Sequence, residues 1–152
     1  MKARLKKFVR VSTGSSAPYR YKSLSLDDSI RVLELKPAAS PQIPIHCSLT
    51  EIKLSPKAQY EALSYVWGPD EFPETLNLPD GHLKITKNLA SALRSLRMTN
   101  RPRILWVDAV CINQSDDIEK GSQVGRMASV YKNASGVIAW LGDDSKETPV
   151  AM

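Results

Sequence analysis

The sequence predicts a single α/β domain built around a parallel β-sheet with crossover helices. Its length of 152 residues suits one domain with a core of its own. Short apolar segments typical of buried strands alternate with two segments whose apolar residues recur at helical spacing. The order strand, helix, strand, helix, strand from Glu61 onward favours parallel strands, because each helix returns the chain to the starting edge of the sheet.

Three segments are expected to form the parallel strands. The segment of residues 61–67 is short and mostly apolar, and Gly68 and Pro69 are expected to end the strand that it forms. Residues 104–107 are apolar and β-prone, and residues 137–141 form a third apolar run that ends at Gly142. We therefore expect these three segments in one sheet.

Two segments are expected to form the crossover helices. In residues 88–98, leucines recur at i, i+4 and i+7, and Thr86 or Asn88 can cap the helix. Residues 117–133 carry an apolar stripe that includes Val124 and Tyr131, and acidic residues crowd the start of this segment, as the helix dipole favours. The second helix should therefore begin close to the end of the second parallel strand.

The two ends of the chain depart from this regular pattern. An N-terminal β-rich elaboration is expected, because residues 29–35 and 43–54 have strand character and residues 75–78 and 83–86 flank a proline- and glycine-containing turn. Few residues follow the third parallel strand, so the sheet looks truncated at the C-terminus. We expect apolar surface around Ile138 and Trp140 to be exposed as a result.

The positive charge is concentrated in residues 1–22, which divides the chain into this basic tail and a domain of residues 23–152. Seven of the 21 basic residues lie at or before Lys22, where no acidic residue occurs, and the other 14 are outnumbered by the 16 acidic ones. Such a tail is suited to contact with nucleic acid, anionic lipid or an organelle import machinery. We expect a disordered, solvated extension instead, since terminal segments are commonly so and only Tyr19 and Tyr21 supply nearby aromatic rings.

The composition argues against a secreted, membrane-spanning or metal-binding protein. There is no apolar core of a secretory signal and no stretch approaching the ~20 apolar residues of a membrane span. Cys47 and Cys111 lie far apart, and neither they nor His46 and His82 have the spacing of a metal site. We expect a cytoplasmic protein with reduced cysteines and no metal.

Unusual residues follow each of the three expected strands. The first strand ends at Trp67 and continues into Gly68, Asp108 and then Asn113 follow the second, and Gly142 with two acidic residues follows the third. Because the carboxyl ends of parallel strands meet at one edge of a sheet, we predict a binding site there. Two simpler explanations stay open: Trp67 packs in the core, and Asp108 accepts hydrogen bonds from the loop that follows it.

Glu119 is the candidate catalytic residue, in the first turn of the second expected helix. That position would aim its carboxylate into the cleft, where partial desolvation beside Asp108 would raise its pKa and suit it to an acid, base or cation-stabilising role. The simpler alternative is that Glu119 only complements the helix dipole, so that its loss costs a few tenths to ~1 kcal/mol.

The sequence also resembles the HET (heterokaryon incompatibility) domain of fungal proteins. The resemblance runs from about Tyr19 to Gly142, and residues 30–35 resemble the usual lead-in. It rests on blocks that match in order and spacing: Tyr60-Glu-Ala-Leu-Ser-Tyr-Val-Trp-Gly68, Ile85-Thr-Lys-Asn-Leu-Ala-Ser-Ala-Leu93, Leu105-Trp-Val-Asp-Ala-Val-Cys-Ile-Asn-Gln114, Glu119 with Gln123, Met127, Tyr131 and Ala134, and Trp140-Leu-Gly142.

This resemblance implies a fungal signalling module of vegetative incompatibility and innate immunity, which triggers programmed cell death through self-assembly or protein partners. It also implies a distant relation to TIR domains, and hence a TIR/flavodoxin-like sheet. Some TIR domains cleave NAD at its glycosidic bond with one glutamate, which corresponds by position to Glu119. The alternative function is therefore an NAD glycohydrolase that takes NAD as substrate and holds no resident cofactor. HET domains ordinarily extend past the last block, so a fragment this short is expected to be inactive as an enzyme.

Overall fold

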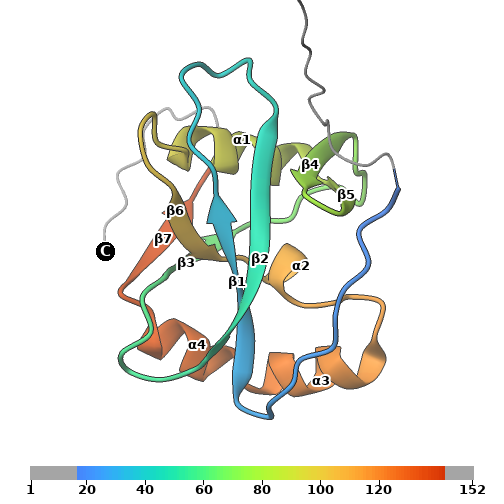
Figure 1. The fold of residues 1–152 in the computed structure, drawn as a ribbon, viewed down its shortest axis with the longest axis vertical. Coiled ribbons are helices and arrows are strands. Elements are labelled where there is room, and N and C mark those ends of the chain that lie inside the picture. The colour runs from blue at the N-terminus through green and yellow to red at the C-terminus, as the bar shows by residue number, and fades with distance from the viewer. Residues whose placement is uncertain (1–16, 143–152) are drawn as a thin grey trace, which may run out of the picture.

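The computed structural model describes residues 17–142, which form one seven-stranded mixed sheet with four helices (Figure 1). Residues 1–16 of the basic tail and the acidic pair after Gly142 lie outside the described residues. The strands run in the order β5-β4-β2-β1-β6-β3-β7 across the sheet. The element bounds are β1 Ser29–Leu35, β2 Ile45–Lys53, β3 Glu61–Tyr65, β4 Glu74–Leu78, β5 Gly81–Ile85, α1 Lys87–Leu96, β6 Arg103–Trp106, α2 Asp108–Cys111, α3 Asp117–Gly125, α4 Met127–Asn133 and β7 Gly136–Trp140.

The predicted parallel strands are confirmed. β3 pairs in parallel with β6 on one side and with β7 on the other, so the three carboxyl ends share one edge. The chain leaves β3 through the β4–β5 hairpin and α1 before it enters β6, and it leaves β6 through α2, α3 and α4 before it enters β7. These helical connections are what allow the three strands to run in the same direction.

The N-terminal strands are not an elaboration beside the sheet, as the sequence suggested, because β1 is the central strand of the seven. It pairs antiparallel with both β2 and β6, which makes the sheet mixed. All residues of β1 except Glu34 are buried. Burial on both faces explains why its apolar residues do not follow the strict alternation of a half-exposed strand.

The helices agree with the sequence at their starts and differ in their continuity. Thr86 caps α1, since its hydroxyl accepts a hydrogen bond from the backbone N–H of Leu89 at 3.1 Å. The single helix expected over residues 117–133 is two helices that break at Arg126, directly after Gly125. Glycine is a poor helix former, which accounts for a break at this place. The loop expected after β6 begins with the single turn α2.

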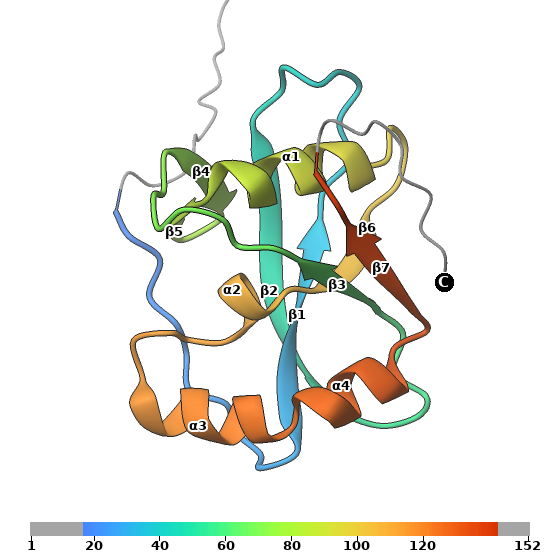
Figure 2. The ribbon, with the colours of Figure 1, turned by 180° about the vertical axis from the view of Figure 1, so that it is seen from behind.

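The helices lie mainly on one side of β1 and β2. In Figure 1 these two long strands cross in front of the helices, and the view from behind brings α1, α2, α3 and α4 to the front (Figure 2). Among residues 17–142, no helix combines the length and apolarity needed to cross a bilayer.

Apolar surface is exposed around Ile138 and Trp140, as expected, but it belongs to the residues beside them. Ile138 and Trp140 are half-buried, whereas Val137 and Leu141 are 55% and 63% exposed. Neighbouring residues on a strand face opposite sides, so the inward position of Trp140 forces its neighbours outward. The Trp140 indole reaches α1, where its Nε1–H donates to Oδ1 of Asn88 at 3.3 Å.

A matched pair of glycine substitutions tests how residues 17–19 are held against β5. The backbone of Tyr19 donates to the carbonyl of His82 at 2.8 Å, and a Cβ on Gly81 would lie 2.8 Å from backbone atoms of Ala17 and Tyr19. We expect Gly81→Ala to lower the free energy of unfolding by about 1–3 kcal/mol in urea titrations, because backbone must move to make room.

Gly121→Ala is the control. A Cβ there meets no atom within 4 Å, and the site is inside α3, so alanine should stabilise by about 0.5–1 kcal/mol. If Gly81→Ala has the stability of the wild type, residues 17–19 do not lie as close to Gly81 as the structure places them.

Candidate functional site

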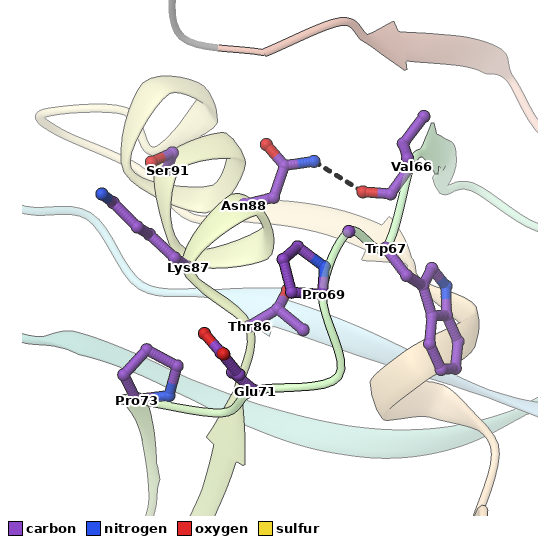
Figure 3. Close-up of a pocket in the computed structure, with 10 residues that line it drawn as sticks. Val66, Trp67, Pro69, Glu71, Pro73, Thr86, Lys87, Asn88 and Ser91 are labelled. Carbon is purple, nitrogen blue, oxygen red and sulfur yellow. Dashed lines mark hydrogen bonds between the residues drawn. The ribbon is translucent and has the colours of Figure 1, made fainter.

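The loop of residues 66–73, which follows β3, forms one wall of the candidate site. Gly68 has φ +78°, a left-handed conformation that glycine adopts without strain. The carbonyl of Val66 accepts a hydrogen bond from Nδ2 of Asn88 at 2.6 Å (Figure 3). The same Asn88 amide accepts from Trp140, so one side chain at the start of α1 ties the β3 exit to β7.

This loop and α1 enclose a pocket of about 370 Å³, here called the loop pocket. Figure 3 shows Pro69 and Thr86 near its middle, with Lys87 and Ser91 on the helix side and the indole of Trp67 on the opposite side. Gly68, one of the residues predicted for the site, lines this pocket.

Trp67 and Asp108 meet across the carboxyl edge of the sheet, close to where the sequence predicted a site. The Trp67 indole Nε1–H donates to Oδ1 of Asp108 at 3.3 Å. Burial raises the pKa of the Asp108 carboxyl, and the hydrogen bonds from Trp67 and the Ala109 backbone partly oppose that rise. Trp67 is 40% exposed, so it is a wall of the site and not a core residue.

A second pocket, of about 350 Å³, also has Trp67 in its lining and is here called the Trp67 cleft. Its lining includes Asn113, another predicted site residue, and it shares Trp67 and Thr86 with the loop pocket. Its lining residues come from the segment before β1, the β3 exit, β5, α1 and the α2–α3 region: Tyr21, Tyr65, Trp67, Phe72, Leu83, Lys84, Ile85, Thr86, Leu89, Ala109, Asn113, Gln114, Ser115 and Lys120.

Glu119 lines neither of these pockets. Its carboxylate is held by Arg31 of β1, whose Nη1 donates to Oε2 at 2.5 Å and whose Nη2 donates to Oε1 at 2.9 Å. Oε2 also accepts from the backbone N–H of Asn113 at 2.8 Å. Glu119 borders a different hollow, of about 320 Å³, between α3 and residues 23–27. The structure thus joins Trp67 to Asp108 and places Gly68 and Asn113 in two pockets that share Trp67, whereas Glu119 lies outside both pockets and contacts this group only through the backbone N–H of Asn113.

Arg31 is the buried partner of Glu119 that the sequence reasoning missed. Its side chain is 5% exposed, and besides Glu119 it donates to the carbonyls of Cys111 at 3.1 Å and Lys22 at 2.8 Å. The Tyr21 ring lies 4.9 Å from its guanidinium carbon, a cation–π contact. A detectable signal was present: an arginine inside an otherwise apolar strand needs buried partners, because an unpaired buried charge is very unfavourable.

The Arg31–Glu119 pair fixes the charge state of both groups. Burial acts to raise the pKa of Glu119, but the hydrogen bonds from Arg31 and Asn113 outweigh it, so the net pKa is lowered. Burial acts to lower the pKa of Arg31, and Glu119 reverses this as well. The carboxylate is therefore ionised at neutral pH, and a raised pKa that would suit it to proton transfer is not what this environment produces.

The two cysteines of residues 17–142 lie in the interior of the domain. Cys47 and Cys111 are buried free thiols, and burial raises the pKa of Cys111 to about 12, so it is protonated at neutral pH. Within the same residues, no three His, Cys, Asp or Glu side chains gather as a metal would require.

The fold and the site define an α/β domain with a ligand-sized cleft at the edge of parallel strands. The chain belongs to the heterokaryon incompatibility (HET) protein family, whose model matches residues 60–152. It is 36% identical over 153 aligned positions to heterokaryon incompatibility protein 6, OR allele, of Neurospora crassa. That match covers 88% of this chain and 22% of the relative, so the chain spans about a fifth of the relative's length. No solved structure matches the chain.

Glu119→Gln should destabilise the fold far more than a lost helix-dipole contact would. The amide keeps the size of the side chain but leaves the buried Arg31 charge without its counter-charge. We expect a loss of about 3–5 kcal/mol in the free energy of unfolding, measured by urea titration at pH 7. The matched control is Glu61→Gln, which breaks a pair with Arg103 whose side chains are 22–32% exposed and should cost about 1 kcal/mol or less.

The pH dependence of this loss follows from the lowered pKa of Glu119. A group with a folded pKa below its unfolded value of about 4.3 stabilises the fold fully above that value and loses its contribution as the pH falls through the folded pKa. The difference between wild type and Glu119→Gln should therefore be constant from about pH 7 to pH 5 and shrink below about pH 4. Equal losses of stability in Glu119→Gln and Glu61→Gln would contradict a buried Arg31–Glu119 pair.

Proposed function

We propose that this chain acts in heterokaryon incompatibility as a cytoplasmic signalling module that triggers fungal programmed cell death through self-assembly or partner binding. Membership of the HET family supports the role in incompatibility. The structural feature that supports association is β7, at one edge of the sheet.

The outer side of β7 has no strand partner among residues 17–142. Its sequence, Gly-Val-Ile-Ala-Trp, contains no charge and no proline, the two features that most often protect edge strands from pairing with another chain. The exposed side chains of Val137 and Leu141 add apolar contact area beside the free backbone groups. An added strand from a second copy or a partner would satisfy those groups.

The alternative function, cleavage of NAD by Glu119 in a TIR-like site, has weaker support. It needs a carboxylate that meets the ligand, whereas both oxygens of Glu119 accept hydrogen bonds from Arg31 or Asn113. Release of nicotinamide when the chain is incubated with NAD, and its loss in a correctly folded Glu119 variant, would favour this alternative over the signalling module.

Val137→Lys should weaken self-association of the 152-residue chain. A lysine on the edge strand places a charge where a second strand would pair, which opposes pairing. In sedimentation velocity over a concentration series, we expect the association constant to fall by about tenfold or more, equivalent to about 1.4 kcal/mol. Expression of the same variant in a fungal host should reduce cell death in parallel.

Ile118→Lys serves as the matched control. Ile118 is 87% exposed on α3, so the change removes a similar apolar side chain and adds the same charge away from β7. It should leave association and cell death unchanged. Equal effects of the two variants, or wild-type association in Val137→Lys, would remove β7 from the proposal.

A further inference from the structure

The Trp67 cleft combines a ligand-sized volume with half-exposed aromatic walls. Its volume of about 350 Å³ is within the range of small-molecule sites, which is about 300–1,000 Å³. Trp67 and Phe72, both from the loop of residues 66–73, line it and are 40% and 43% exposed. Large aromatic rings bordering a cavity provide faces on which a planar ligand can stack.

The indole of Trp67 is held in place before any ligand arrives. Its Nε1–H is fixed by Asp108, and the carbonyl of the preceding Val66 is fixed by Asn88 (Figure 3). A ring that is already oriented loses little conformational freedom when a ligand binds, which favours affinity.

The cleft is also positively charged. Lys84 and Lys120 both line it, and its lining contains no aspartate or glutamate. Within residues 17–142 neither amine forms an ion pair, although Lys84 Nζ donates to Oγ1 of Thr75 at 3.0 Å. Two lysines without counter-charges in a concave site attract an anion.

Polar groups in the cleft remain available for hydrogen bonds. Asn113, Gln114 and Ser115 supply amide and hydroxyl groups on the α2–α3 side. Within residues 17–142, only the Oδ1 of Asn113, which accepts from the backbone N–H of Ser115, and the Nε2 of Gln114, which donates to the carbonyl of Asp108, have a hydrogen-bond partner among these side-chain atoms. Amide and hydroxyl groups of this kind can hydrogen-bond to the polar atoms of a ligand.

We infer that the Trp67 cleft binds a small aromatic anion of about the size of a nucleoside monophosphate, with its ring against Trp67 and its anionic group near Lys84 and Lys120. Glu119 takes no part, because it lies outside the cleft. The inference is independent of association through β7, since β7 supplies no lining residue.

Calorimetric titration of the 152-residue chain with adenosine monophosphate and with adenosine tests this inference. We expect the monophosphate to bind at least about fivefold more tightly than the uncharged nucleoside, because only it carries the anionic group. Lys120→Gln should weaken binding of the monophosphate several-fold and leave adenosine unchanged. Trp67→Ala should weaken both ligands, because both stack through the same base.

Lys132→Gln is the control variant, since Lys132 is an exposed lysine of α4 that does not line the cleft. It should bind both ligands as wild type does. Circular dichroism would confirm that each variant is folded. The inference is overturned if no binding of the monophosphate is detected at millimolar concentration, if Trp67→Ala leaves its affinity unchanged, or if Lys120→Gln and Lys132→Gln weaken it equally.

Discussion

The buried charge of Arg31 constrains much of the fold around it. A guanidinium on the central strand of a sheet is tolerated only when nearly all its donors are satisfied. Its partners come from three separate segments: the carbonyl of Lys22, nine residues earlier, the carbonyl of Cys111 at the end of α2, and the carboxylate of Glu119 in α3. The hydrogen bonds of the Arg31 guanidinium therefore fix where residues 21–22, α2 and α3 lie relative to β1.

The candidate site depends on the same contacts. Tyr21, which stacks beside Arg31 and donates its hydroxyl to the carbonyl of Val110 at 2.6 Å, is part of the cleft wall. Asn113, whose backbone N–H donates to Glu119, is part of another wall. The ion pair thus positions the cleft without lining it, and Glu119 fits a structural role in which its ionised carboxylate neutralises Arg31.

The sequence predicted well the features that depend on neighbouring residues, and poorly those that depend on contacts between residues distant in sequence. Apolar runs located the parallel strands, and Thr86 was one of the two residues predicted to cap the first helix, because both features depend on neighbouring residues. The central place of β1 depends on pairing with β6, about 70 residues later, which no local pattern encodes. The same applies to Glu119: its helix-terminal position was evident, but the partner that decides its chemistry is 88 residues earlier.

The most direct test is the ionisation of Glu119 in the folded chain, followed by the carboxyl ¹³C chemical shift as the pH is lowered. The account predicts a titration midpoint below the ordinary glutamate value of about 4.3, because Arg31 and the Asn113 N–H stabilise the charged form. That midpoint should rise in an Arg31→Met variant that remains folded. A midpoint at or above the ordinary value in the wild-type chain would contradict the ion pair and reopen the assignment of Glu119 as an acid or base.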